Sequence, residues 1–248
     1  KDYDAICIAI GSQVPRNLPI EGRELKGVHY AMEFLTAQNK LVAKDSLTYD
    51  EVIDAKGKNV LVIGGGDTGS DCIGTANRQG AASVLQIEIL PKPSKLEDIP
   101  NPWPAPFPTV LKTSSSHLEG CERRWSLNTK RFIGENGKLS AVELIEVAWE
   151  QDETGKHIMK EIGKPEIHKI DLVFLALGFV HPIQEGLLQE LGIKTDDVRH
   201  NVETDSNRKT NISKIFGAGD CVSGQSLVVT SIASGRKTAE HIDHFLKS

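Results

Sequence analysis

The chain has 248 residues and a formal net charge of −5, with 29 Lys and Arg against 34 Asp and Glu. This acidic balance argues against a surface that binds nucleic acid or an anionic membrane, and 39% hydrophobic with 25% charged residues excludes a disordered chain. No uncharged run reaches the ~18–20 residues of a membrane helix, no signal segment is recognisable, and the four cysteines form no C-x-x-C pair, so we expect a cytoplasmic globular protein without disulfides or a metal site.

The first predicted element is an unbroken apolar strand, Ala5–Ile10, which ends at Gly11. Such a run is typical of a central parallel strand that is buried on both faces. A polar loop follows over residues 12–26, and the pattern predicts helices over residues 28–39 and 50–56.

The next segment has the order of a βαβ unit. A buried strand over residues 59–63 leads directly into a glycine-rich turn over residues 64–69. A helix is predicted over residues 70–79 with Gly80 as its stop, followed by a strand over residues 83–90.

The segment 91–108 is rich in proline, which predicts a loop. Strands are predicted over residues 126–132 and 141–150, and a turn over residues 152–155 leads into a returning strand over residues 157–162. These three strands predict an antiparallel hairpin or meander with one face in water.

The chain contains a short internal repeat. Residues 4–11 read D-A-I-C-I-A-I-G, and residues 171–178 read D-L-V-F-L-A-L-G. The repeat suggests two similar nucleotide-binding units, each closed by such a strand. A further strand over residues 214–220 precedes a helix predicted over residues 227–246.

The glycines of the turn follow the spacing Gly64-x-Gly66-x-x-Gly69 between a buried strand and a helix. The first glycine permits the tight turn, the second lets a pyrophosphate approach the backbone, and the third lets the helix pack on the strand. Free N–H groups at the start of the helix then bind the phosphates. The alternative is a glycine-rich turn that binds no ligand.

Glu88 lies near the end of the following strand, close to the position ~20 residues after the turn where an acid binds the ribose 2′-hydroxyl of NAD. A carboxylate there repels a 2′-phosphate, and Lys92 is the one cation between Ser83 and Ser94. The sequence therefore favours NADH over NADPH. The alternative is a solvated charge at a strand edge.

Asp220 ends an apolar strand as G-A-G-D, where its carboxylate could accept hydrogen bonds from the polyol chain of a flavin. Gln225 and Ser226 precede the last helix, whose positive N-terminal end suits an electron-rich ring. His117 with Cys121, and His241 with His244, have helical spacing but offer only two ligands each, so we interpret them as packing or surface residues.

Together these features identify a resemblance. The motifs G-G-G-D-T-G-S-D-C-I-G-T (64–75), N-P-W-P (101–104), T-K-R-F-I (129–133), D-L-V-F-L-A-L-G-F (171–179) and G-A-G-D…G-Q-S-L-V-V (217–229) resemble the small (beta) subunit of glutamate synthase. The resemblance implies an NAD(P)H-dependent, FAD-containing oxidoreductase. Hydride would pass from NAD(P)H to FAD, and electrons would pass through iron–sulfur centres to the large (alpha) subunit, where glutamine and 2-oxoglutarate become glutamate.

The resemblance also implies cofactor contacts. The glycine turn would hold the NAD(P) pyrophosphate, Asp71 would lie near the nicotinamide, and Gly219 with Asp220 would touch the ribityl chain of FAD. The full candidate set is Gly11, Gly64, Gly65, Gly66, Asp67, Thr68, Gly69, Asp71, Glu88, Gly178, Gly219, Asp220, Gln225, Ser226 and Leu227. Gln225, Ser226 and Leu227 would lie beside the isoalloxazine ring, and no catalytic or metal residue is assigned.

The expected fold is α/β, with two nested Rossmann-like dinucleotide-binding domains and an antiparallel meander. Residues 1–16 and 180–248 would form the C-terminal part of the FAD domain, residues 57–179 the NAD(P) domain, and residues 17–56 a connecting segment. The family begins with a cysteine-rich iron–sulfur region and a first glycine turn for FAD. Neither is found in this sequence, so we expect an incomplete FAD domain and a C-terminal fragment.

Two other functions stay open. One is a module that binds NAD(P) but does no redox chemistry. The other is a related iron–sulfur flavoprotein subunit that passes electrons to pyrimidines or ferredoxin.

Overall fold

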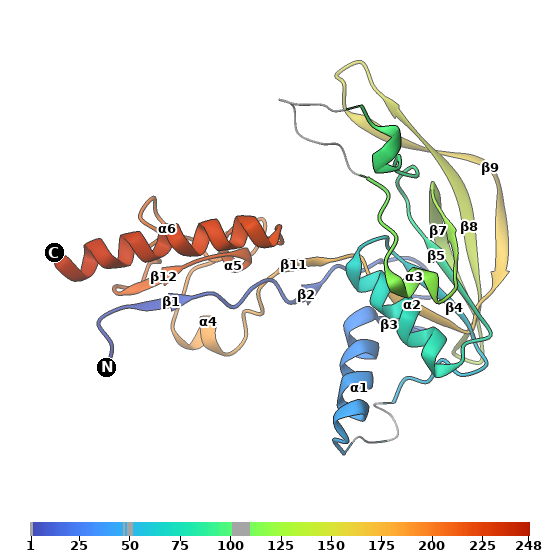
Figure 1. Ribbon diagram of the computed structural model, residues 1–248, viewed down its shortest axis with the longest axis horizontal. Helices are drawn as coiled ribbons and strands as arrows, with labels where there is room; N and C mark the ends of the chain where they lie inside the picture. Colours follow the sequence, from blue (N-terminus) through green and yellow to red (C-terminus); the bar gives the residue numbers. More distant parts are fainter. Residues whose placement is uncertain (1, 47, 49–51, 101–109) are drawn as a thin grey trace. The chain divides into compact units, whose positions relative to one another are not determined.

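The computed structural model describes residues 2–46, 48, 52–100 and 110–248. The chain divides into two compact units (Figure 1). The larger unit spans Asn17–Leu177, and the smaller unit combines Lys1–Arg16 with Gly178–Ser248. Among the helices of these described ranges, none has the length and apolar character that a membrane crossing requires.

A parallel sheet forms the centre of the larger unit. Its strands lie in the order β3 (Val28–Tyr30), β10 (Leu172–Leu175), β4 (Asn59–Ile63), β5 (Ser83–Ile87) and β6 (Glu122–Arg124), and every neighbouring pair is parallel. The central strands β4 and β10 are continuous apolar runs because both of their faces are covered.

Two helices, α1 (Ala31–Ala43) and α2 (Asp67–Gln79), cover one face of this sheet (Figure 1). Val60 and Val62 of β4 pack on this side. The ring of Phe34 from α1 stacks on Phe174 of β10, with ring centroids 4.0 Å apart. Cys72, Ile73 and Ala76 of α2 belong to the same buried cluster, so α2 packs against β4, the strand that precedes it.

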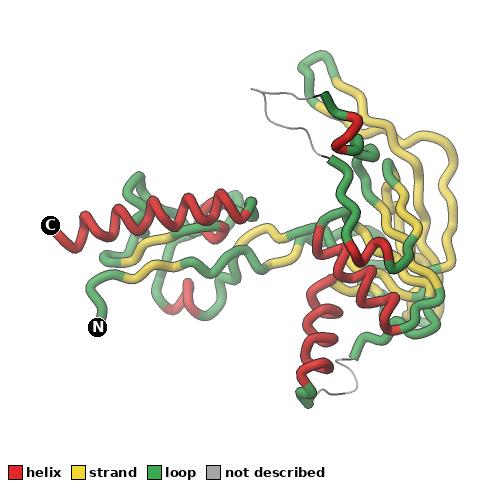
Figure 2. The backbone as a smooth tube through the Cα atoms, in the orientation of Figure 1, coloured by secondary structure: helices red, strands yellow, loops and turns green. Residues whose placement is uncertain are grey.

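An antiparallel meander covers the other face. Its strands β7 (Leu127–Glu135), β8 (Lys138–Gln151) and β9 (His157–Lys169) pair in sequence order, and their long course is visible in Figure 2. The turn between β8 and β9 is closed by a hydrogen bond from Gly155 N to Asp152 O, at 2.9 Å. The predicted combination of a parallel sheet with an antiparallel meander is confirmed.

The smaller unit contains two short sheets. Strand β1 (Ile6–Ile8) pairs in parallel with β12 (Ile215–Gly217), and β2 (Val14–Pro15) pairs antiparallel with β11 (Phe179–His181). Three helices complete the unit: α4 (Leu187–Glu190), α5 (Asp220–Ser223) and α6 (Val228–Lys247). Its buried core consists of Ile8, Leu188, Ile193, Val202, Ile215 and Cys221.

The first predicted strand differs from the structure. Strand β1 covers Ile6–Ile8 alone, and the side chain of Ile6 is 43% exposed. Within the described residues β1 pairs with β12 on one side only, so the expectation of burial on both faces is wrong here. An apolar run indicates that a strand can be buried, but it does not indicate how many other strands pair with it.

Two predicted helices also need correction. Residues 28–30 form strand β3, which pairs with β10, and helix α1 begins only after it. Within the predicted helix 50–56, the described residues 52–56 are not helical. There the carboxylate of Asp54 accepts a hydrogen bond from Lys56 N at 2.9 Å, a local bond that competes with helix formation. The segment 17–56 therefore contributes a strand and a helix to the larger unit.

The proline-rich stretch is described in part. Residues 91–100 include a short 3₁₀ turn, η2 (Leu96–Asp98). Residues 101–109, which contain the N-P-W-P motif, lie outside the described residues.

Candidate functional site

The glycine-rich turn lies between a buried strand and a helix, as the sequence predicts, but the helix begins at Asp67 and not at residue 70, so Gly69 lies in its first turn. Strand β4 ends at Ile63, and α2 begins at Asp67 with Gly66 as its N-cap. Gly66 has no side chain to cap the helix, and the first-turn N–H groups have no acceptor within the helix. The positive end of the helix dipole is therefore directed at this turn, which suits an anion.

The three motif glycines have different surroundings. Gly64 has φ +123°, and a Cβ there would lie 2.3 Å from the carbonyl oxygen of Ala176 on the segment after β10. A Cβ on Gly69 would lie 2.5 Å from the carbonyl oxygen of Gly64. Packing of the chain itself therefore requires glycine at both positions.

Gly66 is the exception. Nothing lies within 4 Å of a Cβ built on it, and its φ of −82° is open to any residue. No close contact requires a glycine at Gly66, and the backbone there is open to a ligand.

Glu88 follows β5 and reaches the turn. Its Oε2 accepts a hydrogen bond from Gly65 N at 2.7 Å, and its Oε1 accepts one from Ile89 N at 3.0 Å. A carboxylate has about four acceptor sites, so these bonds leave capacity for hydroxyl donors of a ligand. The structure thus brings the predicted acid and the predicted turn together.

A pocket of about 260 Å³ opens beside the turn. Its lining combines the turn and Glu88 with Trp125 and with Arg123 and Arg124 of β6. The lining residues are Gly65, Gly66, Asp67, Gln86, Glu88, Leu90, Pro91, Pro93, Val110, Leu111, Lys112, Arg123, Arg124 and Trp125. Apolar walls with a few convergent polar groups are typical of small-molecule sites.

The sequence reasoning missed the basic side of this pocket. Arg123 and Arg124 come from β6, whose E-R-R sequence shows no apolar strand pattern. Both guanidiniums have protein partners: Arg123 donates to Gln86 and Thr113, and Arg124 pairs with Glu166 at 3.5 Å. The two arginines line the pocket because β6 pairs with β5, the strand that ends next to Glu88. They are distant from Glu88 in the sequence.

The remaining candidates on α2 lie on its first turns. Asp67 is exposed, Thr68 is half-buried, and Asp71 is exposed one turn further along. All three lie on the helix that begins at the turn.

In the smaller unit, Asp220 has a fixed position at the start of α5. Its Oδ1 accepts hydrogen bonds from Ser226 Oγ and Ser231 Oγ, each at 2.7 Å. Burial alone would raise the pKa of Asp220, but these hydrogen bonds outweigh burial and lower the pKa below its ordinary value. The group is therefore a charged carboxylate near neutral pH.

Among the other candidates of this unit, Gln225 contacts the segment at Gly178. Gln225 Oε1 accepts a hydrogen bond from Phe179 N at 2.8 Å, and a Cβ on Gly178 would lie 2.6 Å from that oxygen. Leu227, the N-cap of α6, is 73% exposed. Gly11 has φ +70° with nothing within 4 Å of a Cβ, and the buried Gly219 has φ +70° directly before Asp220.

The four cysteines are free thiols: Cys7, Cys72, Cys121 and Cys221. Burial raises the pKa of the Cys72 thiol well above its ordinary value, which keeps it protonated. Across the described part of the chain, no three His, Cys, Asp or Glu side chains are grouped so that they could hold a metal ion.

Comparison with known proteins gives consistent matches. A family model described as pyridine nucleotide-disulphide oxidoreductase matches residues 1–235. The glutamate synthase [NADPH] small chain of Mycobacterium tuberculosis is 44% identical over 248 residues, which cover 99% of this chain and 50% of that protein. The glutamate synthase [NADH] of Schizosaccharomyces pombe is 43% identical over 253 residues, which cover 98% of this chain and 12% of that protein.

Among solved structures, the fold is similar to that of Mycobacterium tuberculosis FprA in complex with NADPH. The TM-score is 0.67 at 17% sequence identity, over 99% of this chain and 63% of that chain. The chain thus spans about half the length of the small-chain relative and a smaller share of the Schizosaccharomyces pombe protein.

Proposed function

The chain belongs to the pyridine nucleotide-disulphide oxidoreductase family, and from this premise we propose that it transfers hydride from NAD(P)H to FAD as part of a glutamate synthase small chain. The names of its relatives support the second part of the proposal. The larger unit would bind the nicotinamide coenzyme, and the smaller unit would hold the flavin end of FAD.

The observation that carries the coenzyme site is the open backbone at Gly66. A pyrophosphate can approach this residue without a steric barrier and accept hydrogen bonds from the first-turn N–H groups of α2. Packing against the chain accounts for Gly64 and Gly69, whereas the backbone at Gly66 is left open to a ligand. This open backbone, together with the uncapped N–H groups at the start of α2, is the main support for assigning the pyrophosphate to the turn.

The residues of the smaller unit fit a flavin. The second oxygen of Asp220 can accept hydrogen bonds from ribityl hydroxyls, because Ser226 and Ser231 both bind Oδ1. Backbone N–H groups at the start of α6 can face the electron-rich part of the ring. FAD, when bound, supplies the acceptor for the hydride that NAD(P)H donates.

For the coenzyme we propose NADH over NADPH. Glu88 lies at the turn itself, where a carboxylate accepts hydrogen bonds from ribose hydroxyls and repels a 2′-phosphate. Three cations line the pocket, and two of them, Arg123 and Arg124, already bind protein acceptors; the third is Lys112. The preference proposed here rests on the contact of Glu88 with the turn.

We expect Glu88→Ala to reduce the preference for NADH by roughly 5- to 150-fold, which corresponds to about 1–3 kcal/mol of charge repulsion and desolvation. The measurement is the ratio of the dissociation constants for the two coenzymes. If the substitution weakens pyrophosphate binding at the turn, it weakens the binding of both coenzymes equally, so this effect cancels in the ratio.

Glu122→Ala is the matched control, because Glu122 is an exposed carboxylate of β6 that does not line this pocket. A wild-type chain that prefers NADPH, or a Glu88→Ala chain with an unchanged ratio, would remove Glu88 as the discriminating residue.

We further propose that the electrons pass through iron–sulfur centres outside these 248 residues to a large glutamate synthase chain in the cytoplasm. The test is NADH-dependent formation of glutamate from glutamine and 2-oxoglutarate by the complete small chain with its large chain. Glutamate formation supports the proposal. Reduction of a dye with no glutamate formed would instead indicate another electron acceptor.

The 248-residue chain on its own is expected to retain FAD weakly. Its described residues offer the flavin-end contacts around Asp220, whereas the glycine-rich strand–helix turn at Gly64–Gly69 belongs to the larger unit. Charge-assisted pyrophosphate contacts contribute ~1.5–3 kcal/mol each, so their lack lowers affinity by orders of magnitude. Flavin absorbance after dialysis measures this, and stoichiometric FAD that survives dialysis would contradict it.

A further inference from the structure

We propose that Gln86 and His117 are positioning residues for the coenzyme, which hold the peptide group between Gly64 and Gly65 in a fixed orientation. The N–H groups of the turn would thereby be oriented before the pyrophosphate arrives. This inference rests on the proposed function, because it explains how the same site is preorganised.

The peptide group between Gly64 and Gly65 is held from both sides by side chains of one strand end. Its carbonyl oxygen, on Gly64, accepts a hydrogen bond from Gln86 Nε2 at 3.0 Å. Its N–H, on Gly65, donates to Glu88 Oε2 at 2.7 Å. Glycines rotate easily about their backbone bonds, so this peptide would be the softest part of the turn without these two contacts.

The orientation of the Gln86 amide follows from its partners. The backbone N–H of Ser114 donates to His117 Nδ1 at 3.0 Å, so Nδ1 carries no proton and the neutral ring carries its proton on Nε2. That Nε2–H donates to Gln86 Oε1 at 3.1 Å, and Arg123 Nε donates to the same oxygen at 3.0 Å. The Gln86 NH₂ group is therefore directed at Gly64.

Packing does not require a glutamine at this position. Gln86 is 3% exposed, and it lies beside Val62 of β4 and two residues after the buried Val84. An aliphatic side chain would fill the site without the cost of removing an amide from water. An aliphatic residue could not, however, donate the hydrogen bond that Gln86 gives to the Gly64 carbonyl.

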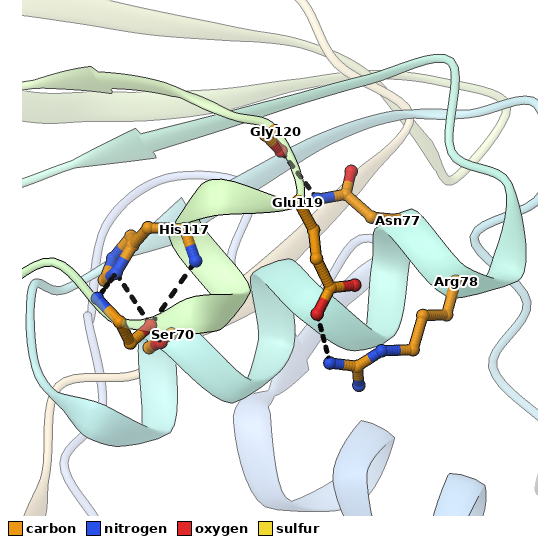
Figure 3. Close-up of polar contacts among 7 residues, drawn as sticks. Ser70, Asn77, Arg78, His117, Glu119 and Gly120 are labelled. Carbon is orange, nitrogen blue, oxygen red and sulfur yellow. Dashed lines mark hydrogen bonds and ion pairs between the residues drawn. The ribbon is translucent and has the colours of Figure 1, made fainter.

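His117 is itself held in place by the attachment of α3 (Ser115–Leu118) to α2 (Figure 3). Three pairs join the two segments: the hydroxyls of Ser70 and Ser114, the amide of Asn77 with the carbonyl of Gly120 at 2.6 Å, and the ion pair of Arg78 with Glu119. Gly74 of α2 permits this approach, since a Cβ there would lie 2.7 Å from Ser116 Oγ. The imidazole is thus a fixed link between α2 and β5.

The arrangement requires a neutral imidazole. A proton on Nδ1 would face the Ser114 N–H, which is also a donor. Burial, together with the positive charge of Arg123, lowers the pKa of His117. Arg78 and Glu119, at the contact between α2 and α3, pair with each other. Coenzyme affinity is therefore expected to hold through neutral pH and to fall at a pH below the ordinary histidine range.

The test is the NADH dissociation constant of the 248-residue chain and its variants. Gln86→Leu is expected to weaken NADH binding about tenfold, because it removes the contact to Gly64 without changing charge. His117→Leu is expected to weaken binding by a smaller factor. His117→Gln is expected to restore affinity, since its amide can donate to Gln86 from near the Nε2 position, and to abolish the acid loss of affinity.

Asn77→Ala is the matched control. It breaks a hydrogen bond between the same two segments, but Asn77 has no contact with the turn. We expect it to lower the melting temperature and leave the dissociation constant unchanged.

The outcomes separate the two proposals. No NADH binding by the wild-type chain would overturn the proposed function and this inference with it. Normal wild-type binding with unchanged affinity in Gln86→Leu and His117→Leu would overturn the inference alone, as would equal weakening by Asn77→Ala. If Gln86→Leu does not fold, the His117 pair decides: affinity lost in the leucine variant and regained in the glutamine variant supports the inference, and equal affinities contradict it.

Discussion

Valine in place of Gly66 is expected to reduce NADH affinity by roughly 100- to 10,000-fold while the chain stays folded. The backbone around Gly66 is open, with nothing within 4 Å of a Cβ, so the fold can accept a residue with a Cβ at this position. The valine side chain would occupy the space through which the pyrophosphate reaches the N–H groups of α2. Loss of two charge-assisted hydrogen bonds at ~1.5–3 kcal/mol each gives this range.

Fluorescence titration with NADH measures the affinity of the variant, and a thermal melt shows whether it is folded. Gly66→Ala provides a graded partner, because a methyl group intrudes less than an isopropyl group and should reduce affinity by a smaller factor. Unchanged affinity in a folded Gly66→Val chain would show that the coenzyme binds elsewhere.

Alanine in place of Gly64 is expected to have the opposite result: a large loss of stability. The new Cβ would lie 2.3 Å from the Ala176 carbonyl oxygen, and the φ of +123° is strained for any residue with a side chain. Backbone strain of ~1–3 kcal/mol and overpacking of ~1–3 kcal/mol together predict a loss of about 2–6 kcal/mol.

For a unit of this size, 1 kcal/mol lowers the melting temperature by roughly 2–4 °C, so the expected decrease is on the order of 4–24 °C. Calorimetry measures this decrease in melting temperature. Gly66→Ala is the matched reference, because it adds the same methyl group at another glycine of the turn. A Gly64→Ala chain as stable as Gly66→Ala would contradict the close contact with Ala176, and with it the account of why the glycines differ.

The sequence was sufficient to predict the strand, turn and helix of the coenzyme site. Residues 60–63 of β4 are apolar because the strand is covered on both faces, and this run ends where the glycines begin. Gly80 ends α2 in a left-handed conformation, as a helix stop at that position requires. These features are local, so they can be read from residues that are close together in the chain.

The features that could not be predicted depend on pairing between distant segments. Arg123 and Arg124 enter the pocket because β6 pairs with β5, and a polar three-residue strand gives no periodic signal. The role of His117 depends on Gln86, which looks like an ordinary polar residue in the sequence. The spacing of His117 and Cys121 predicts a packing or surface residue at His117, and it gives no sign of the hydrogen bond from His117 to the buried Gln86.

The repeat of residues 4–11 and 171–178 shows the same limit. Asp171 joins β10 to the start of β4, where its carboxylate accepts hydrogen bonds from the Asn59 backbone at 2.8 Å and side chain at 3.1 Å. Asp4, at the matching place in the first copy, lies 3.8 Å from Lys214 at the start of β12. Asp171 thus joins its strand to a neighbour by hydrogen bonds, whereas Asp4 makes only a long, exposed ion pair. The number of neighbouring strands also differs between the copies within the described residues, and the eight residues themselves do not indicate it.

The most direct test of the coenzyme site is a titration of the isotopically labelled chain with NADH, followed through its backbone amide resonances. The account predicts that the largest shifts occur at the amides of Gly65–Ser70, with further shifts at Glu88, and that Gly66→Val removes them. Saturable NADH binding that leaves the amides of Gly65–Ser70 unmoved and shifts another part of the chain would contradict the assignment of the turn as the pyrophosphate site.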